Sequence, residues 1–321
     1  MTGSLGYKSH LSGPSDLVTT HDEYRAGFLS LALEKNTRAT PFIKEAKSLR
    51  QAVLKTKSPR DLLKMDSIQY AFLKAAGVSD KAESYLTDED KKNAKIHLIE
   101  KFLEPAGPSF VDELVYRFLL TQGDALGGIM RNLGGEWSKI KFLDMMRATL
   151  YNAGANYEIL LRDNKEWQRN SRGSVPSEEI KALRWVNPSN NKTFRTLIVD
   201  YKVRIVNKNV DACLFKDTRD NLKDDFYQDP SNFISLGELK GGTDPAGADE
   251  HWKTGNTALQ RIRDAFSRVS MKPSTFFVGA AIENAMASEI WDQLNRNILS
   301  NAANLTKEAH LEAICLWILS L

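Results

Sequence analysis

The sequence predicts an α/β (α+β) fold in which a mixed β-sheet is flanked by helices and a helical domain is added. Three observations support this prediction. Apolar residues in the first half of the 321-residue chain recur at helical spacing. After Gly154 the apolar residues gather in short runs typical of strands. The final third alternates strands with helical segments, as in sheets covered by helices.

The first half is expected to be helical. Thr20 and Glu23 have the spacing of a capping box, which begins a helix that runs to residue 36. Pro41 then suits the first turn of a new helix. Four further helices are expected at residues 59–65, 67–76, 79–86 and 87–103. After a break at 105–108, helices are expected at 110–122 and 137–153, with a glycine-rich segment at 123–132 between them.

The second half is expected to supply the sheet. Strands are predicted at residues 157–161, 195–200, 202–206, 210–215, 234–239 and 275–282. The polar segments 164–177 and 217–230 are expected to be loops. Helices are predicted at 248–266, 283–297 and 306–319. Because single cores tend to split at roughly 250–300 residues, one large domain and a smaller one are expected.

Composition excludes several classes of protein. The formal net charge of +3 is too small to indicate a nucleic-acid partner by itself. Cys213 and Cys315 are the only cysteines, so neither a disulfide framework nor a cysteine zinc site is expected. The chain has no apolar run near the roughly 18 residues of a membrane span and no secretory leader pattern. We therefore expect a cytoplasmic protein with no membrane partner.

Charged residues interrupt two of the predicted strands. Glu238 and Lys240 lie in the apolar run 233–240, and side chains two apart on a strand share a face. Asp211 lies within another strand pattern. Buried charges are costly, so their presence here calls for a reason. Two acids and a lysine on adjacent strands suit a divalent-metal nuclease, although Glu-x-Lys is also typical of an exposed ion pair across strands.

The chemistry of phosphodiester hydrolysis explains this residue set. An enzyme must lower the barrier of such a reaction by roughly 20 kcal/mol. One acid or base raises the reaction rate only about 10²–10⁴-fold. A bound Mg²⁺ supplies much of the rest, and it prefers oxygen ligands. Asp211 and Glu238 are the expected metal ligands, with the Leu239 carbonyl as a third. Lys240 would hold the attacking water or stabilise charge on the phosphorus.

The segment after this strand offers further candidates. Two glycines, Gly241 and Gly242, permit close approach of a backbone, here expected to be DNA. His251 follows at the start of the next predicted helix, and histidine is the side chain suited to proton transfer near neutral pH. The alternative for His251 is a surface histidine. Lys253 on the same helix is expected to bind a phosphate, with a solvated helix face as the alternative.

Several of these segments together resemble the AvaI/BsoBI family of type II restriction endonucleases, within the PD-(D/E)xK superfamily. The resemblance covers residues from about 20 to the C-terminus. It rests on Asp211 and on the blocks at 123–132, 237–242 and 244–254. The long run from 237 to 254 is far more specific than the three charged residues alone.

The resemblance implies a restriction-endonuclease-like fold and a division of labour. Residues 1–36 and 107–321 would form the catalytic nuclease domain, and 37–106 a helical domain that embraces DNA. It implies a Mg²⁺-dependent homodimer, surrounding double-stranded DNA in a prokaryotic cytoplasm. It also implies cleavage of CYCGRG after the first cytosine, with four-base 5′ overhangs, and a cognate DNA methyltransferase in the same system but not in a stable complex.

Individual residues acquire expected roles from the same resemblance. Asp211, Glu238 and Lys240 match the catalytic triad, and His251 matches the histidine that activates water. Lys81 and Asp244 match base-reading positions, through hydrogen bonds to guanine and cytosine. Two further DNA contacts are expected from the residues themselves, at Lys208 and Arg131. The alternatives are a solvated lysine for Lys81, an Asp-Pro turn for Asp244 and helix termination at Arg131.

Three other functions compete with this interpretation. A repair or junction-resolving nuclease would share the charged triad but not the block at 237–254. A DNA-binding protein with a dead nuclease domain would not need Asp211, Glu238 and Lys240 intact. A hydrolase of small substrates based on His251 would leave the helical half unexplained.

Overall fold

The computed structural model describes residues 6–163, 166–169, 175–187, 193–217 and 225–321. The chain divides into two compact units, Met1–Phe28 with Leu133–Leu321 and, between them in sequence, Leu29–Asn132. These bounds lie outside the expected helical domain at 37–106. The reason is that one continuous helix runs through each boundary, α2 (His21–Val53) and α6 (Phe110–Asn152). The division of function between the units stays a prediction.

Helix α2 is longer than the sequence predicted. Its capping box is present, because the Thr20 backbone N–H donates to Glu23 and the Glu23 N–H donates to Thr20 Oγ1. The predicted break before Pro41 is wrong, and the helix continues through it. Proline removes an N–H donor and crowds the carbonyl four residues earlier, at a cost of about 3 kcal/mol, which the other residues of this 33-residue helix offset.

Helix α6 likewise contains no break at the glycine-rich segment, so the prediction of two helices at 110–122 and 137–153 is wrong. Each helical glycine costs about 1 kcal/mol relative to alanine, which a 43-residue helix with buried side chains toward both ends can offset. Among the residues that the structure describes, the positive-φ glycines are Gly77, Gly107 and Gly154, and none of them lies inside α6. Gly154 follows the end of that helix, as left-handed glycines commonly do.

The Leu29–Asn132 unit has a core of its own. Buried apolar side chains of the second half of α2 pack with those of α3 (Gln69–Ala75), α5 (Asp88–Leu98) and the first turns of α6. Phe72, Leu103 and Phe118 are fully buried in this cluster. The short helix α4 (Asp80–Glu83) is tied to α3 by the buried Lys74, whose Nζ lies 2.8 Å from carboxylate oxygens of both Asp80 and Glu83.

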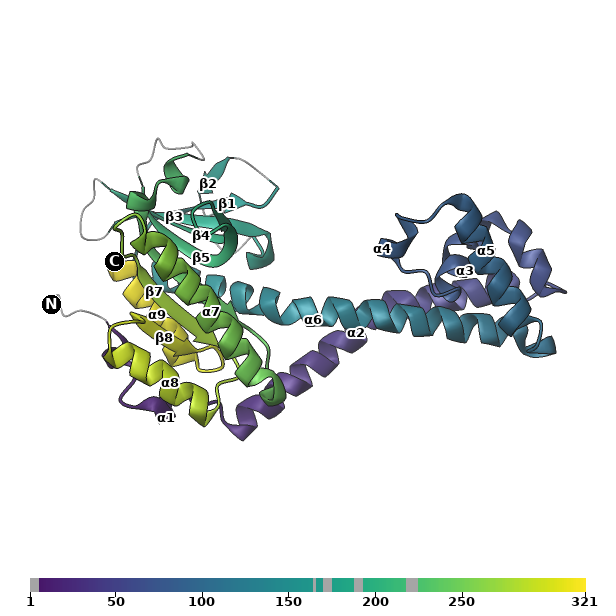
Figure 1. The fold of residues 1–321 in the computed structure, drawn as a ribbon, viewed down its shortest axis with the longest axis horizontal. Helices are drawn as coiled ribbons and strands as arrows, with labels where there is room; N and C mark the ends of the chain where they lie inside the picture. Colours follow the sequence, from purple (N-terminus) through teal and green to yellow (C-terminus); the bar gives the residue numbers. More distant parts are fainter. Residues whose placement is uncertain (1–5, 164–165, 170–174, 188–192, 218–224) are drawn as a thin grey trace. The chain divides into compact units, whose positions relative to one another are not determined.

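The other unit is built on a mixed sheet with the strand order β2-β1-β3-β4-β5-β6-β7-β8 (Figure 1). The strands are β1 (Tyr157–Leu161), β2 (Trp167–Arg169), β3 (Ile180–Val186), β4 (Phe194–Val203), β5 (Lys208–Asp217), β6 (Phe233–Lys240), β7 (Ser274–Gly279) and β8 (Asn301–Asn304). Neighbours from β2 to β6 are antiparallel, whereas β6, β7 and β8 run parallel. The predicted fold class, a mixed sheet flanked by helices, is confirmed.

Helices cover both faces of this sheet (Figure 1). The second half of α6 and α9 (Glu308–Ser320) pack on one face, where Phe142, Leu214 and Ile314 share a core. On the other face lie α7 (Ala248–Ser267) and α8 (Asn284–Asn295), with the short α1 (Pro14–Leu17) beside α8. None of the helices among the described residues has the length and apolar character needed to cross a membrane.

Four strand predictions need correction. Residues 195–200 and 202–206 were predicted as two strands, but β4 is one strand that ends at Val203. The misleading residue is Asp200, which has a left-handed backbone (φ 52°) inside the strand. Strands β2, β3 and β8 were not predicted, and β2 lies within residues 164–177, which were predicted to be a loop. β8 is four residues long with asparagine at both ends, a residue depleted in strands, and both asparagines are completely buried.

Candidate active site

The central strands bring the predicted acids together. β5 and β6 are antiparallel with Ala212 opposite Gly237, so Asp211 lies level with Glu238 where the paired segment ends. Gly237 is a packing requirement, because a Cβ there would lie 2.1 Å from the Phe276 ring on β7. The end of β6 is thus pressed between its neighbours, and Glu238 projects from a strand with little freedom to move.

Glu238 and Lys240 form a direct ion pair, as their two-residue spacing predicted. Lys240 Nζ lies 2.7 Å from Glu238 Oε1, and their side chains are 23% and 10% exposed. The Lys240 chain passes Gly255 on α7, where an added Cβ would lie 3.5 Å from Lys240 Cε. The pair therefore lies at the sheet end, supported by α7 yet still reached by solvent.

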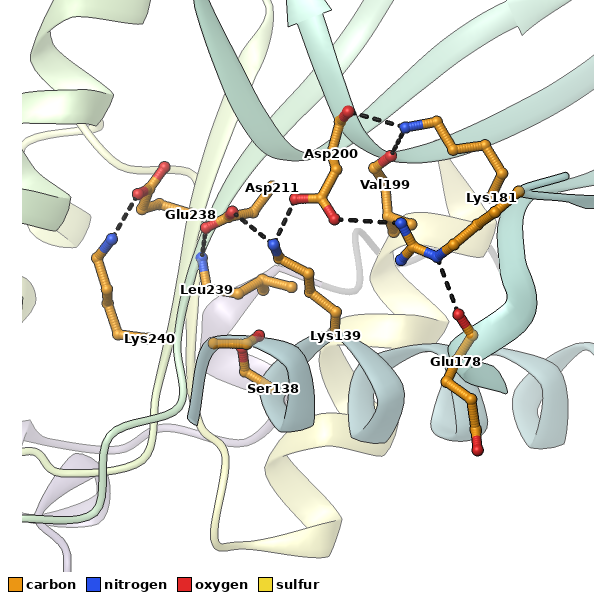
Figure 2. A network of polar contacts seen from close by, with 12 residues as sticks. Ser138, Lys139, Glu178, Lys181, Val199, Asp200, Asp211, Glu238, Leu239 and Lys240 are labelled. Atoms are coloured by element: carbon orange, nitrogen blue, oxygen red, sulfur yellow. Dashed lines mark hydrogen bonds and ion pairs between the residues drawn. The ribbon is translucent and has the colours of Figure 1, made fainter. Parts of the chain in front are cut away.

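Asp211 is held by different partners. Its Oδ2 accepts a hydrogen bond of 2.9 Å from the Leu239 backbone N–H, and its Oδ1 lies 3.5 Å from Lys139 Nζ on α6. Figure 2 shows its carboxylate turned toward Leu239 and Lys139, and the Glu238 carboxylate turned toward Lys240. The three expected catalytic side chains therefore share one strand end, where Lys240 forms an ion pair with Glu238 and Lys139 forms one with Asp211.

The electrostatics of the pair of acids are unfavourable. Burial and the charge of Asp211 raise the pKa of Glu238 from 4.5 to about 7, and Lys240 offsets only part of this effect. A divalent cation between the carboxylates would relieve both causes, and two carboxylates with a backbone carbonyl are the hard oxygen donors that Mg²⁺ prefers. The described residues contain no metal-type cluster of three or more His, Cys, Asp or Glu side chains. The expected ligands Asp211, Glu238 and the Leu239 carbonyl need none.

The glycines after β6 make room for parts of the protein itself, and the expected approach of DNA to them stays a prediction. A Cβ on Gly241 would lie 1.8 Å from the Gly134 carbonyl oxygen of α6. A Cβ on Gly242 would lie 2.2 Å from His251 Nε2. The helix and the imidazole therefore occupy the space that side chains at these positions would fill.

His251 lies in the first turn of α7, half-buried against the chain that leaves β6. The imidazole is next to Gly242, two residues beyond Lys240. This location is compatible with the expected role near the scissile phosphate, and the role stays a prediction. The packing of the imidazole against Gly242, where any side chain would displace the ring, argues against the alternative of a surface histidine.

The expected DNA contacts occupy varied surroundings. Lys208 is exposed at the start of β5, three residues before Asp211. Asp244 is exposed, and its Oδ1 accepts a hydrogen bond of 2.9 Å from the Ala246 N–H at the short 3-10 turn Pro245–Gly247. Lys253 is exposed and forms an ion pair with Asp249 one turn earlier on α7. These three side chains are accessible, and their contacts to DNA stay predictions.

The remaining two candidates belong to the Leu29–Asn132 unit. Lys81 is exposed on α4, where its backbone carbonyl accepts from Ser84 Oγ. Arg131 lies in α6, which continues past it, so the alternative of helix termination there is wrong. Its side chain lies outside the described part of the structure.

Sequence reasoning missed two charged residues that adjoin the acids. Lys139 on α6 forms an ion pair with Asp200, and Asp200 lies opposite Asp211 because Val199 pairs with Ala212 and Tyr201 with Val210. Asp200 ends an apolar run just as Asp211 interrupts one, and that signal was available in the sequence. Lys139 gave none, because a lysine on a long amphipathic helix is normally solvated.

Comparisons with known proteins point to one family. The family model described as restriction endonuclease BsobI matches residues 7–321. The type II restriction enzyme AvaI of Nostoc sp. is 48% identical over 318 residues, which cover 99% of this chain and all of that protein. The type II restriction enzyme BsoBI of Geobacillus stearothermophilus is 47% identical over 325 residues, 98% of each chain. The similarity therefore includes both compact units and every candidate residue.

Proposed function

Because this chain belongs to the BsobI restriction endonuclease family, we propose that it is a type II restriction endonuclease, a site-specific deoxyribonuclease that cuts both strands of duplex DNA. The family resemblance predicted from the sequence motifs is thereby confirmed. The finer parts of the proposal are Mg²⁺ dependence and cleavage of CYCGRG after the first cytosine, leaving four-base 5′ overhangs. The observation that carries the proposal is the Glu238–Lys240 ion pair level with Asp211, on adjacent strands of a chain matched by the family from residue 7 to 321.

The residues around the two acids each have a separate role in the proposed hydrolysis. Asp211, Glu238 and the Leu239 carbonyl would hold Mg²⁺. When bound, the cation supplies charge neutralisation at the phosphoryl oxygens and a water of lowered pKa. Lys240, released from Glu238, directs its ammonium at the developing negative charge. His251 receives the proton of the attacking water, from its position against Gly242.

DNA recognition follows from symmetry. A palindromic hexamer offers two identical half-sites, so a homodimer reads it with one set of contacts used twice, and each protomer cuts one strand. Asp244 accepts a hydrogen bond from a cytosine amino group, and Lys81 donates to guanine acceptors. The sugar-phosphate backbone of the DNA is bound by Lys208, Arg131 and Lys253. The enzyme works in the prokaryotic cytoplasm, where a cognate methyltransferase protects host DNA without forming a stable complex with it.

A paired binding and cleavage assay tests this function. A labelled duplex with one CYCGRG site is incubated with the protein in Mg²⁺ or in Ca²⁺, beside a duplex with that site scrambled. We expect specific binding with either ion and cleavage only with Mg²⁺ at the intact site. Binding without cleavage in Mg²⁺ would identify a dead nuclease domain. Cleavage that follows DNA structure instead of sequence would identify a junction-resolving nuclease.

A further inference from the structure

The Lys139 ammonium lies beside Asp211, where it would compete with a metal ion for that carboxylate. Its Nζ is 3.5 Å from Asp211 Oδ1, one of the oxygens expected to hold the cation, and it also bonds to Asp200. A lysine ammonium is charged near neutral pH, and this one lies between the carboxylates of Asp200 and Asp211.

Asp200 is arranged to hold Lys139. Asp200 Oδ1 accepts the short hydrogen bond from Lys139, while Asp200 Oδ2 lies 3.5 Å from Arg162 Nη1. The left-handed backbone at Asp200 is uncommon for a residue with a side chain. Lys181 supports it, because its Nζ donates to the backbone carbonyls of Val199 and Asp200 at 2.6 and 2.8 Å. Figure 2 shows Lys139 between the Asp200 and Asp211 carboxylates, with Lys181 on the far side of Asp200.

These contacts give the two residues opposite effects on a cation at Asp211. A fixed positive charge near a ligand oxygen repels an incoming divalent ion, and the repulsion is strong in a half-buried site. A carboxylate that binds the lysine draws that charge away and weakens the repulsion. Lys139 is therefore expected to lower the affinity of the site for a divalent cation, and Asp200 is expected to raise it.

We propose that the Lys139 ammonium competes with a divalent cation for the Asp211 carboxylate. We propose further that Asp200, by binding Lys139, weakens this competition and thereby sets the affinity of the site for divalent cations. The inference rests on the proposed function, because it takes Asp211 as a metal ligand. Its consequence is a weak site in the free enzyme. The negative charge of a bound DNA phosphate then tips the balance toward the cation, so that the site fills chiefly on DNA.

Direct metal binding to the DNA-free protein tests the pair. Free Mn²⁺ is measured by electron paramagnetic resonance as protein is titrated, for wild type, Lys139→Met and Asp200→Asn. We expect Lys139→Met to bind Mn²⁺ about tenfold more tightly than wild type, and Asp200→Asn about tenfold more weakly. Lys141→Met, an exposed lysine on the same helix, is the matched control and should equal wild type. Asp211→Asn reports how much of the signal belongs to this site.

The direction of the two changes decides the outcome. A role that is only structural would weaken binding in both variants, and parallel shifts of Lys139→Met and Asp200→Asn overturn the proposal. So does an unchanged affinity in Lys139→Met. Lys139→Gln serves as the second charge-removing variant if the melting curve of Lys139→Met shows unfolding. Failure of wild type to cleave DNA in Mg²⁺ would instead refute the proposed function, and it is read in a separate assay.

Discussion

Replacing Glu238 by glutamine should stabilise the metal-free protein while abolishing cleavage. The raised pKa of Glu238 means that its ionised form is disfavoured in the folded state, by burial first and by Asp211 second. A rise from 4.5 to about 7 corresponds to about 3 kcal/mol of lost stability once the group is ionised. The loss is absent below pH 4.5, grows between pH 4.5 and 7, and is complete above pH 7.

The pKa of about 7 already includes the partial offset by the Lys240 ammonium, so the lost pairing with Lys240 is not subtracted a second time. The expectation is therefore a gain of about 3 kcal/mol at pH 8, and no gain at pH 4, where Glu238 is protonated in wild type as well.

Urea unfolding in EDTA, followed at pH 4 and pH 8, measures the difference between wild type and Glu238→Gln. Glu250→Gln, an exposed position on α7, is the matched control and should behave as wild type at both values. If Glu238→Gln is less stable than wild type at pH 8, the reasoning from burial and the neighbouring charge is refuted, and Glu238 is a structural member of an ion pair.

Three further changes follow from the site. Glu238→Ala should abolish cleavage and leave specific DNA binding largely intact, and a collapsed melting transition would count against a purely chemical role. Asp244→Ala should weaken discrimination at one base pair by about 1–3 kcal/mol, measured by competition between cognate and singly altered duplexes, whereas equal weakening on all sequences would argue against base reading. Gly242→Ala should displace the His251 imidazole, since the new Cβ would lie 2.2 Å from Nε2, and should lower the single-turnover cleavage rate at least tenfold. Gly135→Ala adds its methyl group to open space and should leave that rate unchanged.

Much of the sheet unit could be predicted because its signals are local. Strand β6, with charged residues in an apolar run, and the amphipathic α7 both have patterns that a short window reveals. The same locality explains the errors. Gly123 and Pro41 resemble breaks to a local analysis, but each is a single exposed residue inside a long helix whose other residues offset costs of about 1–3 kcal/mol each.

The centre of the site could be predicted only in part. Spacing placed Glu238 and Lys240 on one face, and strand order placed Asp211 beside them. The contribution of α6 could not be predicted, because Lys139 lies 61 residues before its partner Asp200 and nothing local joins them. The reason for Gly241 was also hidden, since it depends on the approach of the Gly134 carbonyl.

Digestion of a sequenced DNA with Mg²⁺, followed by mapping of every new end, shows whether this chain is a site-specific nuclease with Glu238 at its centre. We expect ends only after the first cytosine of CYCGRG, on both strands, with four-base 5′ overhangs, and no ends for Glu238→Ala. Ends at unrelated sequences, or cleavage that persists in Glu238→Ala, would contradict the assignment of Asp211, Glu238 and Lys240 as the centre of a site-specific nuclease.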